Sequence, residues 1–473
     1  MAALCIAVAG SARAQLTGLW GTNPNQTQGA SPYYVTLIQA TDGNFYGTMY
    51  NGGTDATNCD NYVNCGGVVF KYSPPNTYTL LYTFCVSTGC PDGRSPAAGL
   101  VQANDGNFYG TTYAGGTYND GTIFRITPEG VLTTLHSFCN PPNTCSPNDG
   151  SGPQAQLIQA SNNALYGVTT GNSLFKITTK GKFTLLYSFP NGTNPTGTLM
   201  QDGTGALYGT TNGGGSYGEG TVFKSTLGGK VTTLYNFCPA TGCHDGSRPQ
   251  AGLTLGSDGK LYGTTYVGGS NGFGSVFKIT TGGEFTSVYS FAGDANSGHD
   301  GANPNGPLVL ATNGNLYGTS TSGGGPDGSG SVFEISSTGT YSSLATFVDV
   351  EPYCLGTPPW GGLLQSTNGN FYGVQFGSQG CSTAAEFYEF NIGLGPFVTT
   401  IPSYGKVGAK IIIQGSDLTG STSVTFNGIS AGYTVDSATE ITATVPAGGT
   451  TGTVTVTTPS GTLDSNVAFT VTK

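Results

Sequence analysis

The 473-residue sequence contains few charged side chains. Only 8% of its residues are Asp, Glu, Lys or Arg, and 15 basic against 25 acidic residues give a net charge of −10. No cluster of Lys and Arg stands out, so the basic patch used to bind nucleic acid or anionic membranes is missing. After the N-terminus, no segment has the roughly 18 consecutive apolar residues that a transmembrane helix needs. We therefore expect neither a nucleic-acid partner nor a transmembrane segment.

The residues and motifs of common catalytic sites are also scarce. The sequence has three His, and it contains no G-x-S-x-G, H-E-x-x-H or P-loop motif. Paired carboxylates of the glycosidase type could still be assembled from distant loops, so an extracellular carbohydrate-active or metal-dependent enzyme stays open. The scarcity favours a protein without enzymatic activity.

Glycine is abundant, with 79 residues, and aromatic residues reach 11%. The strict Gly-X-Y spacing of collagen is absent. Gly combined with Thr, Val, Tyr and Phe predicts many short strands joined by tight turns.

The N-terminus, MAALCIAVAGSARAQ, is an apolar stretch followed by an A-x-A cleavage pattern at residues 12–14. We interpret residues 1–14 as a signal peptide, the alternative being a short apolar strand. The basic residues that usually begin such a segment are missing, so the natural start could lie upstream of Met1. This interpretation predicts a secreted or cell-surface protein.

Cysteine usage agrees with export. Without Cys5, ten of the 11 Cys remain, and eight of them form close pairs along the sequence. Zinc binding is the alternative, but the pairs lack the C-x-x-C spacing and partner His residues that zinc sites favour. Disulfides are typical of oxidising compartments. The predicted disulfides are Cys59–Cys65, Cys85–Cys90, Cys139–Cys145, Cys238–Cys243 and Cys354–Cys381.

A Tyr-Gly pair recurs along the chain with a spacing near 50 residues, which indicates a repeat architecture. In the second copy four strand-like runs, within residues 99–138, are joined by short turns. Seven units of four antiparallel strands predict an all-β, seven-bladed β-propeller. The copies are Tyr46-Gly47, Tyr109-Gly110, Tyr166-Gly167, Tyr208-Gly209, Tyr262-Gly263, Tyr317-Gly318 and Tyr372-Gly373.

The seventh unit has only three evident strands, because no fourth run follows Phe390. Residues 16–22, approximately, lie about as far before the first blade in the sequence as the fourth strands of other blades lie before the next blade. They could therefore supply the missing strand. We therefore expect the propeller to span residues 15–397 and to close with the chain's own start, which would leave no exposed sheet edge.

Beyond about residue 393 the repeat ends and strands with alternating apolar residues begin. Residues 398–473 predict a small β-sandwich of immunoglobulin-like type.

Two stretches resemble known families. The run LYGTT-x-x-GG…G-[ST]-VF-K…LYSF, over about residues 30–392, resembles the GloVer-type tandem repeat of exported bacterial proteins with varied C-terminal anchors. The stretches GKVGAKIIIQGSDLTGSTSVTFNG and ITATVPAGGTTGTVTVTTPSG resemble an IPT/TIG domain. The first resemblance implies a surface or secreted protein of largely undefined activity, and the second implies a spacer or adhesive module.

The strand order predicts that the two ends of the propeller differ. The loops between second and third strands and those between blades, such as 52–67 and 139–153, are long and irregular, and they share one end, the loop-rich face. The hairpins within blades, such as 104–106 and 128–130, are tight and share the other end, the plain face. All ten predicted disulfide cysteines fall on the loop-rich face. Functional loops are usually the elaborated ones, so we place the binding site on that face.

Two repeated polar positions are candidates for ligand contact. An Asp-Gly pair recurs before each of several blades, and we interpret it as a turn; the alternative is a ring of Ca²⁺ ligands or a metal site that includes the preceding His residues. A glutamine recurs on the innermost strand, either in inter-blade hydrogen bonds or lining a channel for a polar ligand. The residues are Asp92, Asp149, Asp245, Asp300, His244 and His299 for the first position, and Gln39, Gln102, Gln159, Gln201 and Gln365 for the second.

These patterns favour a secreted, non-enzymatic binding or adhesion protein. The propeller would contact an extracellular polysaccharide or a surface protein, and no cofactor is expected beyond the calcium alternative. A structural envelope component is a further alternative. We interpret Tyr-Gly itself as structural, with Gly110 allowing close approach of a neighbouring strand.

Overall fold

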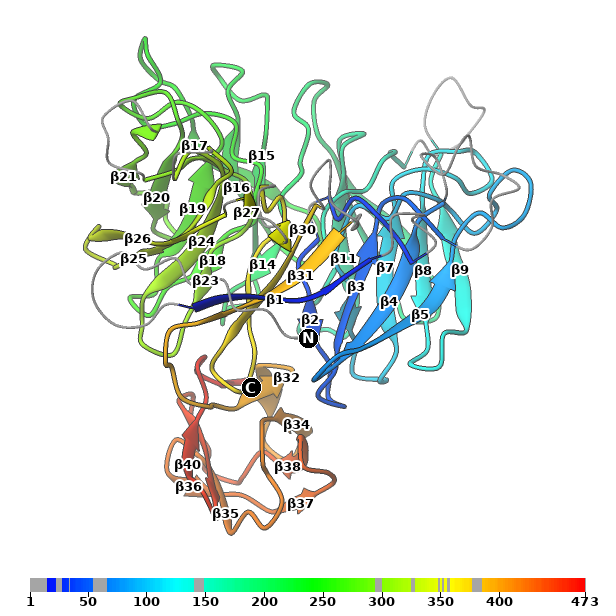
Figure 1. The fold of residues 1–473 in the computed structure, drawn as a ribbon, viewed down its shortest axis with the longest axis vertical. Helices are drawn as coiled ribbons and strands as arrows, with labels where there is room; N and C mark the ends of the chain where they lie inside the picture. The colour runs from blue at the N-terminus through cyan, green and yellow to red at the C-terminus, as the bar shows by residue number, and fades with distance from the viewer. Residues whose placement is uncertain are drawn as a thin grey trace.

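The computed structural model describes residues 15–22, 28–33, 35–53, 66–139, 149–293, 300–324, 328–347, 349–350, 353–354, 358–376 and 385–472. The predicted signal peptide lies outside these residues. The fold is all-β, as predicted, and forms a propeller followed by a small sandwich (Figure 1). Among the described residues, no helix is long and apolar enough to cross a membrane.

Each Tyr-Gly copy lies in its own antiparallel sheet, and we number these sheets blade 1 to blade 7 in chain order. In each blade the short innermost strand leads into a second strand that contains the Tyr-Gly pair. Blades 1 to 3 contain β2 (Ile38–Gln39), β3 (Phe45–Met49), β4 (Val68–Ser73) and β5 (Thr77–Thr83); β6 (Val101–Gln102), β7 (Phe108–Thr112), β8 (Thr122–Ile126) and β9 (Leu132–Ser137); and β10 (Ile158–Gln159), β11 (Leu165–Thr169), β12 (Ser173–Ile177) and β13 (Phe183–Ser188).

The later blades repeat this order. Blades 4 to 6 contain β14 (Met200–Gln201), β15 (Leu207–Thr211), β16 (Thr221–Ser225) and β17 (Val231–Asn236); β18 (Thr254–Leu255), β19 (Leu261–Thr265), β20 (Ser275–Ile279) and β21 (Phe285–Ser290); and β23 (Val309–Leu310), β24 (Leu316–Ser322), β25 (Ser331–Ile335) and β26 (Tyr341–Thr346). In blade 6, β22 (Ala302–Pro304) also pairs with β24. A two-stranded ribbon follows, β27 (Asp349–Val350) with β28 (Tyr353–Cys354).

Blade 7 is built from both ends of the propeller sequence. It contains β29 (Leu364–Gln365), β30 (Phe371–Phe376) and β31 (Ala385–Asn391), and its outer strand is β1 (Gln15–Gly21). The antiparallel register pairs Gln15 with Asn391 and Gly21 with Glu386. The start of the chain therefore completes the last blade.

The Tyr-Gly pair holds each blade together. A Cβ added to Gly110 would lie 2.6 Å from Cζ of Phe124 on the next strand, and the first six copies all have a third-strand Phe at 2.5 or 2.6 Å. The Tyr side chain is buried, and its hydroxyl contacts the Asp or Asn of the preceding turn, as in Tyr109 with Asp105 at 2.7 Å. Glycine is thus needed because the Phe ring fills the space that a Cβ would occupy.

The C-terminal residues form a sandwich with a continuous apolar core. Residues such as Ile413, Phe426 and Val456 alternate inward and are buried. Its strands are β32 (Thr399–Ile401), β34 (Lys410–Gln414), β38 (Glu440–Thr444) and β37 (Tyr433–Val435) in one sheet; β36 (Ile429–Ser430), β35 (Ser423–Phe426), β39 (Val454–Thr458) and β40 (Gly461–Asp464) in the other; and the parallel pair β33 (Tyr404–Lys406) and β41 (Thr470–Thr472).

The sandwich, drawn orange to red in Figure 1, lies against one end of the propeller. Its hydrogen bonds include contacts with the turns between the first and second strands of blades 1 and 7: Thr439 Oγ1 donates to the carbonyl of Thr41 at 2.9 Å, and the hydroxyls of Ser416 and Thr367 lie 2.9 Å apart. These turns belong to the plain face, which the sandwich therefore covers in part.

Candidate functional site

Among the described residues, four aromatic side chains form a cluster on the loop-rich face, where blade 7 meets blade 1. Tyr33 is at its centre, with ring centroids 4.8 Å from Phe376, 5.2 Å from Tyr50 and 5.9 Å from Trp360, all packed edge to face. All four side chains are half-buried. Each residue lies at the end of a second strand or shortly before an innermost strand. Second strands end and innermost strands begin at the loop-rich face, so the four rings lie there. We call these four residues the aromatic cluster.

Next to the aromatic cluster, a small cavity of about 80 Å³ lies on the propeller axis. The segments that enter the innermost strands converge there, because those strands surround the axis. Trp360 belongs to both the cluster and the cavity. The side chains that line the cavity are uncharged, and those with polar groups are Thr36, Gln154, Gln156, Thr196, Thr198, Asn212, Gln250 and Asn305.

One group in this cavity has unused hydrogen-bonding capacity. Asn305 is 3% exposed, and its Nδ2 donates to the carbonyl of Trp360 at 3.3 Å. Its Oδ1 is buried and accepts no hydrogen bond from the described residues. A buried amide oxygen without a donor is uncommon in folded proteins.

The four predicted Asp residues occupy equivalent places in the junctions between blades. Each carboxylate accepts a hydrogen bond from the fourth-strand aromatic and from a backbone N–H in the junction. Asp245, for example, accepts from the hydroxyl of Tyr235 at 2.8 Å and from the N–H of Cys238 at 3.0 Å. The equivalent contacts are Tyr82 and Cys85 with Asp92, His136 and Cys139 with Asp149, and Tyr289 and Ala292 with Asp300.

This geometry agrees with the interpretation of Asp-Gly as a turn. Each Asp lies in a separate blade junction, and His244 is exposed beside Asp245. Among the described residues, no three His, Cys, Asp or Glu side chains are grouped in a way that could hold a metal ion. His299 lies outside the described residues, and the calcium alternative stays a prediction.

Two of the predicted disulfides are present, Cys85–Cys90 and Cys238–Cys243, both in blade junctions on the loop-rich face. Cys139 is also disulfide-bonded, and its predicted partner, Cys145, lies outside the described residues. The pair Cys59–Cys65 also lies outside them, as does Cys381, the predicted partner of Cys354.

The five glutamines form hydrogen bonds between neighbouring blades. Each Oε1 accepts the backbone N–H of a turn in the preceding blade, and each Nε2 donates to a carbonyl in the turn of its own blade. Gln102, for example, joins the N–H of Thr41 at 3.0 Å to the carbonyl of Gly106 at 3.3 Å. We call this arrangement the glutamine clasp. The other clasps join Gln159 to Asn104, Gln201 to Ser161, Gln365 to Thr312, and Gln39 to Thr367.

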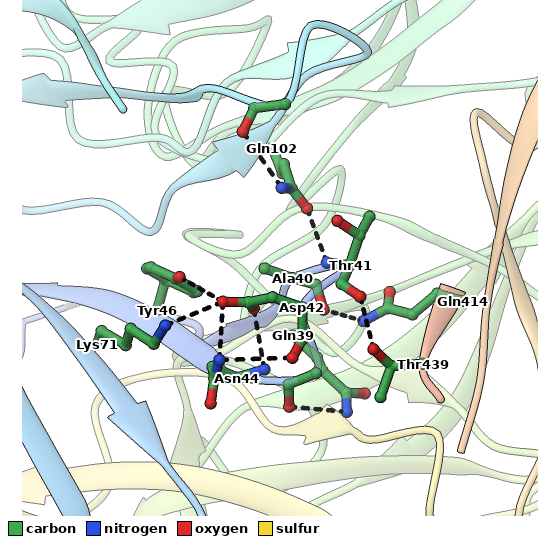
Figure 2. Close-up of polar contacts among 12 residues, drawn as sticks. Gln39, Ala40, Thr41, Asp42, Asn44, Tyr46, Lys71, Gln102, Gln414 and Thr439 are labelled. Atoms are coloured by element: carbon green, nitrogen blue, oxygen red, sulfur yellow. Dashed lines mark hydrogen bonds and ion pairs between the residues drawn. The ribbon is translucent and has the colours of Figure 1, made fainter. Parts of the chain in front are cut away.

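The sequence did not indicate that the plain face also carries an interface. Figure 2 shows Gln414 and Thr439 of the sandwich beside the first turn of blade 1. Gln414 Nε2 donates to the carbonyl of Ala40, and Thr439 Oγ1 donates to that of Thr41. The repeat cannot predict these contacts, because the turn of blade 1 has the same sequence pattern as turns that contact solvent.

The same turn contains an ionised group held by its neighbours. Asp42 accepts hydrogen bonds from Tyr46 at 2.8 Å and Lys71 at 3.0 Å, and from the amide groups of Asn44. Burial alone would raise the pKa of Asp42, but these hydrogen bonds together outweigh it and hold the pKa below its usual range. The carboxylate therefore stays ionised and fixes the turn.

The fold and the site define a β-propeller whose axial cavity is lined by uncharged side chains and lies beside an aromatic cluster. The chain belongs to the Gloeobacter/Verrucomicrobia repeat family, whose model matches residues 11–196 and 170–388. Residues 396–471 match the IPT/TIG domain. Both matches agree with the resemblances found in the sequence. No curated relative matches this sequence.

Solved structures with a similar fold have low sequence identity. A structure described as streptogramin B lyase is 15% identical, with a TM-score of 0.53 over 80% of this chain and 98% of its own. Virginiamycin B lyase from Staphylococcus aureus is 16% identical, with a TM-score of 0.52 over 80% and 99%. At this identity the likeness shows a propeller fold and says nothing of the reaction.

Proposed function

We propose that the protein is a non-enzymatic carbohydrate-binding protein, secreted or held at the cell surface, and that it binds neutral glycans on its loop-rich face. The observation that carries this proposal is the pairing of the aromatic cluster with the uncharged axial cavity. Aromatic faces pack against the apolar faces of sugar rings, and amide and hydroxyl groups fix the orientation of a polar ligand.

The size of the axial cavity limits how the ligand is held. A volume of about 80 Å³ holds a few water molecules or a single polar substituent. A sugar ring would therefore lie over Trp360 and Tyr33, with one hydroxyl directed toward the unpaired Oδ1 of Asn305. This mode of binding needs no charged residue, in agreement with the uncharged lining.

Two further observations support this function. General acid–base catalysis needs a titratable group beside the substrate, and the residues that line the axial cavity include none. The disulfides on the same face are typical of proteins outside a reducing cytosol. The sandwich would act as a spacer or a second contact, since it covers part of the opposite end.

A glycan array and polysaccharide pull-downs with the full chain, with and without EDTA, test the proposal. We expect EDTA-insensitive binding that Trp360→Ala weakens about 30-fold, the ~2 kcal/mol of a central aromatic contact. Tyr217→Ala is the matched control, because Tyr217 is a 53% exposed aromatic in a loop of the same face. Failure to bind any glycan, or equal loss in both variants, would contradict the proposal.

A further inference from the structure

The opposite end of the axis holds a larger cavity, of about 660 Å³, between the propeller and the sandwich. Its propeller side is formed by the inner strands and first turns of blades 3 to 5, and its other side by segments around β33 and β41. This volume is typical of small-molecule sites, which are often found between domains. It lies on the plain face, at the far end of the ring from the aromatic cluster.

The glutamine clasp is interrupted at this cavity. Blade 5 has Leu255 where the clasp has Gln, and Leu255 lines the cavity. In a complete clasp, a Gln at position 255 would accept the backbone N–H of Gly203 in the turn of blade 4. Among the described residues, no hydrogen bond to the Gly203 N–H is present. Gly203 also lines the cavity, with the sandwich residue Thr470 close to it.

The interruption leaves the groups that a carboxamide would satisfy. In the other clasps, one carboxamide accepts a neighbouring turn's N–H and donates to the carbonyl of the residue four positions further along. In blade 5 that residue is Gly259, which is not among the residues that line the cavity, so the Gly203 N–H is the clasp group that a ligand in the cavity would meet. A secondary amide has the same acceptor and donor, and its methyl group could contact the apolar side chains of Leu199 and Leu255, which line the cavity.

The rest of the lining fits a sugar. Thr204, Ser403 and Thr472 supply hydroxyl groups, and Asp202 is the only charged residue among those that line the cavity. Tyr404 lines the cavity too, and its hydroxyl is buried without a hydrogen-bond partner among the described residues. Burial raises the pKa of Tyr404 to about 12, so the hydroxyl remains a donor at neutral pH.

We propose that the cavity between blades 3 to 5 and the sandwich binds an acetamido sugar, whose amide takes the place of the glutamine that blade 5 lacks. The ligand oxygen accepts the Gly203 N–H, the acetyl methyl contacts Leu255, and the sugar hydroxyls meet the hydroxyl-bearing side chains. This site is separate from the aromatic cluster and does not depend on it.

Calorimetric titration of the full chain with N,N′-diacetylchitobiose tests this site, with cellobiose as the ligand that lacks acetamido groups. We expect the first to bind and the second not to bind. Leu255→Gln restores the clasp within the protein and should weaken binding at least about fivefold. Leu310→Gln restores the other missing clasp, between blades 5 and 6, away from the cavity, and should leave binding unchanged.

Two further variants separate the outcomes. Tyr404→Phe removes one hydroxyl without changing the packing and should weaken binding about threefold to tenfold. Trp360→Ala should leave this binding intact, because Trp360 lies at the other end of the propeller. A failure of glycan binding at the loop-rich face can therefore be told apart from a failure of the site proposed here. Equal affinity for cellobiose, unchanged affinity in Leu255→Gln, or no binding of the acetylated disaccharide would overturn the proposal. Preference for N-acetylglutamine amide over the disaccharide would overturn the assignment to a sugar.

Discussion

The two faces of the propeller use the same repeat in different ways. On the plain face the turns are nearly identical, and they are joined by the glutamine clasp and by the Tyr contacts of each second strand. On the loop-rich face the Asp-Gly junctions and the Gly-Gly pairs after the second strands repeat, and the residues around them differ from blade to blade. Side chains that agree among copies hold blades together, whereas the candidate ligand contacts include residues that depart from the repeat, such as Trp360 and Leu255.

Gly110→Ala should have the largest effect on stability. The new Cβ would lie 2.6 Å from Cζ of Phe124, in a contact that the closely packed blade cannot relieve. Overpacking of this kind costs about 1–3 kcal/mol or more, and we expect a lowered midpoint in chemical denaturation. Gly228→Ala is the control, since the nearest atom would be 3.8 Å away. Equal midpoints for the two variants would show that the repeated glycine is not required for packing.

Asp245→Ala tests the junctions of the loop-rich face. It leaves the hydroxyl of Tyr235 and the N–H of Cys238 without their acceptor, at a cost of about 1–3 kcal/mol. If the Asp residues only hold turns, millimolar calcium will not change the melting temperature of the parent protein. A rise in melting temperature with calcium that Asp245→Ala abolishes would instead support the metal alternative.

Gln102→Leu tests the plain face and should cost about 1 kcal/mol, because it removes the hydrogen bonds to Thr41 and Gly106. It copies the natural substitution in blades 5 and 6. Leu310→Gln is the reverse change and should raise stability by a similar or smaller amount. The measurement is equilibrium denaturation of both variants, and a destabilising Leu310→Gln would show that the clasp is not transferable between blades.

Lys71→Met should have the smallest effect. Lys71 Nζ lies 3.0 Å from Asp42, and their side chains are 25% and 40% exposed, so the pair contributes less than about 1 kcal/mol. The pKa of Asp42 is lower in the folded state, so its ionised form stabilises the fold above the unfolded pKa and this contribution is lost as pH falls. Melting curves of the parent and variant should therefore converge in acid. A difference that persists there would assign the effect to packing.

Much of the propeller could be predicted from sequence because its signals are local and repeated. Alternating strands, Asp-Gly and Asn-Gly turns, and the third-strand Phe opposite the glycine in the first six copies all lie within one repeat unit. Contacts between units are different. The partner of Gln102 is the backbone of Thr41, which any residue type would supply, so no pattern in the sequence reveals the pairing.

The candidate sites could not be predicted for a related reason. Tyr33, Tyr50, Trp360 and Phe376 come from the two ends of the propeller sequence, and only the closed ring brings them together. The cavity on the plain face depends on where the sandwich lies. The one available signal was Leu255, which stands where most copies have Gln. From the repeat alone, this replacement indicates only the loss of a hydrogen-bonding side chain.

The contacts of the sandwich also bear on the order of folding. β1 pairs with β31, and Gln414 contacts Ala40 across 374 residues of sequence. The first pairing completes blade 7, and the second contact joins the sandwich to blade 1. Contacts between residues so distant in sequence slow folding. A chain growing from its N-terminus can form blade after blade, but it can complete the circle only after its final strands have been made.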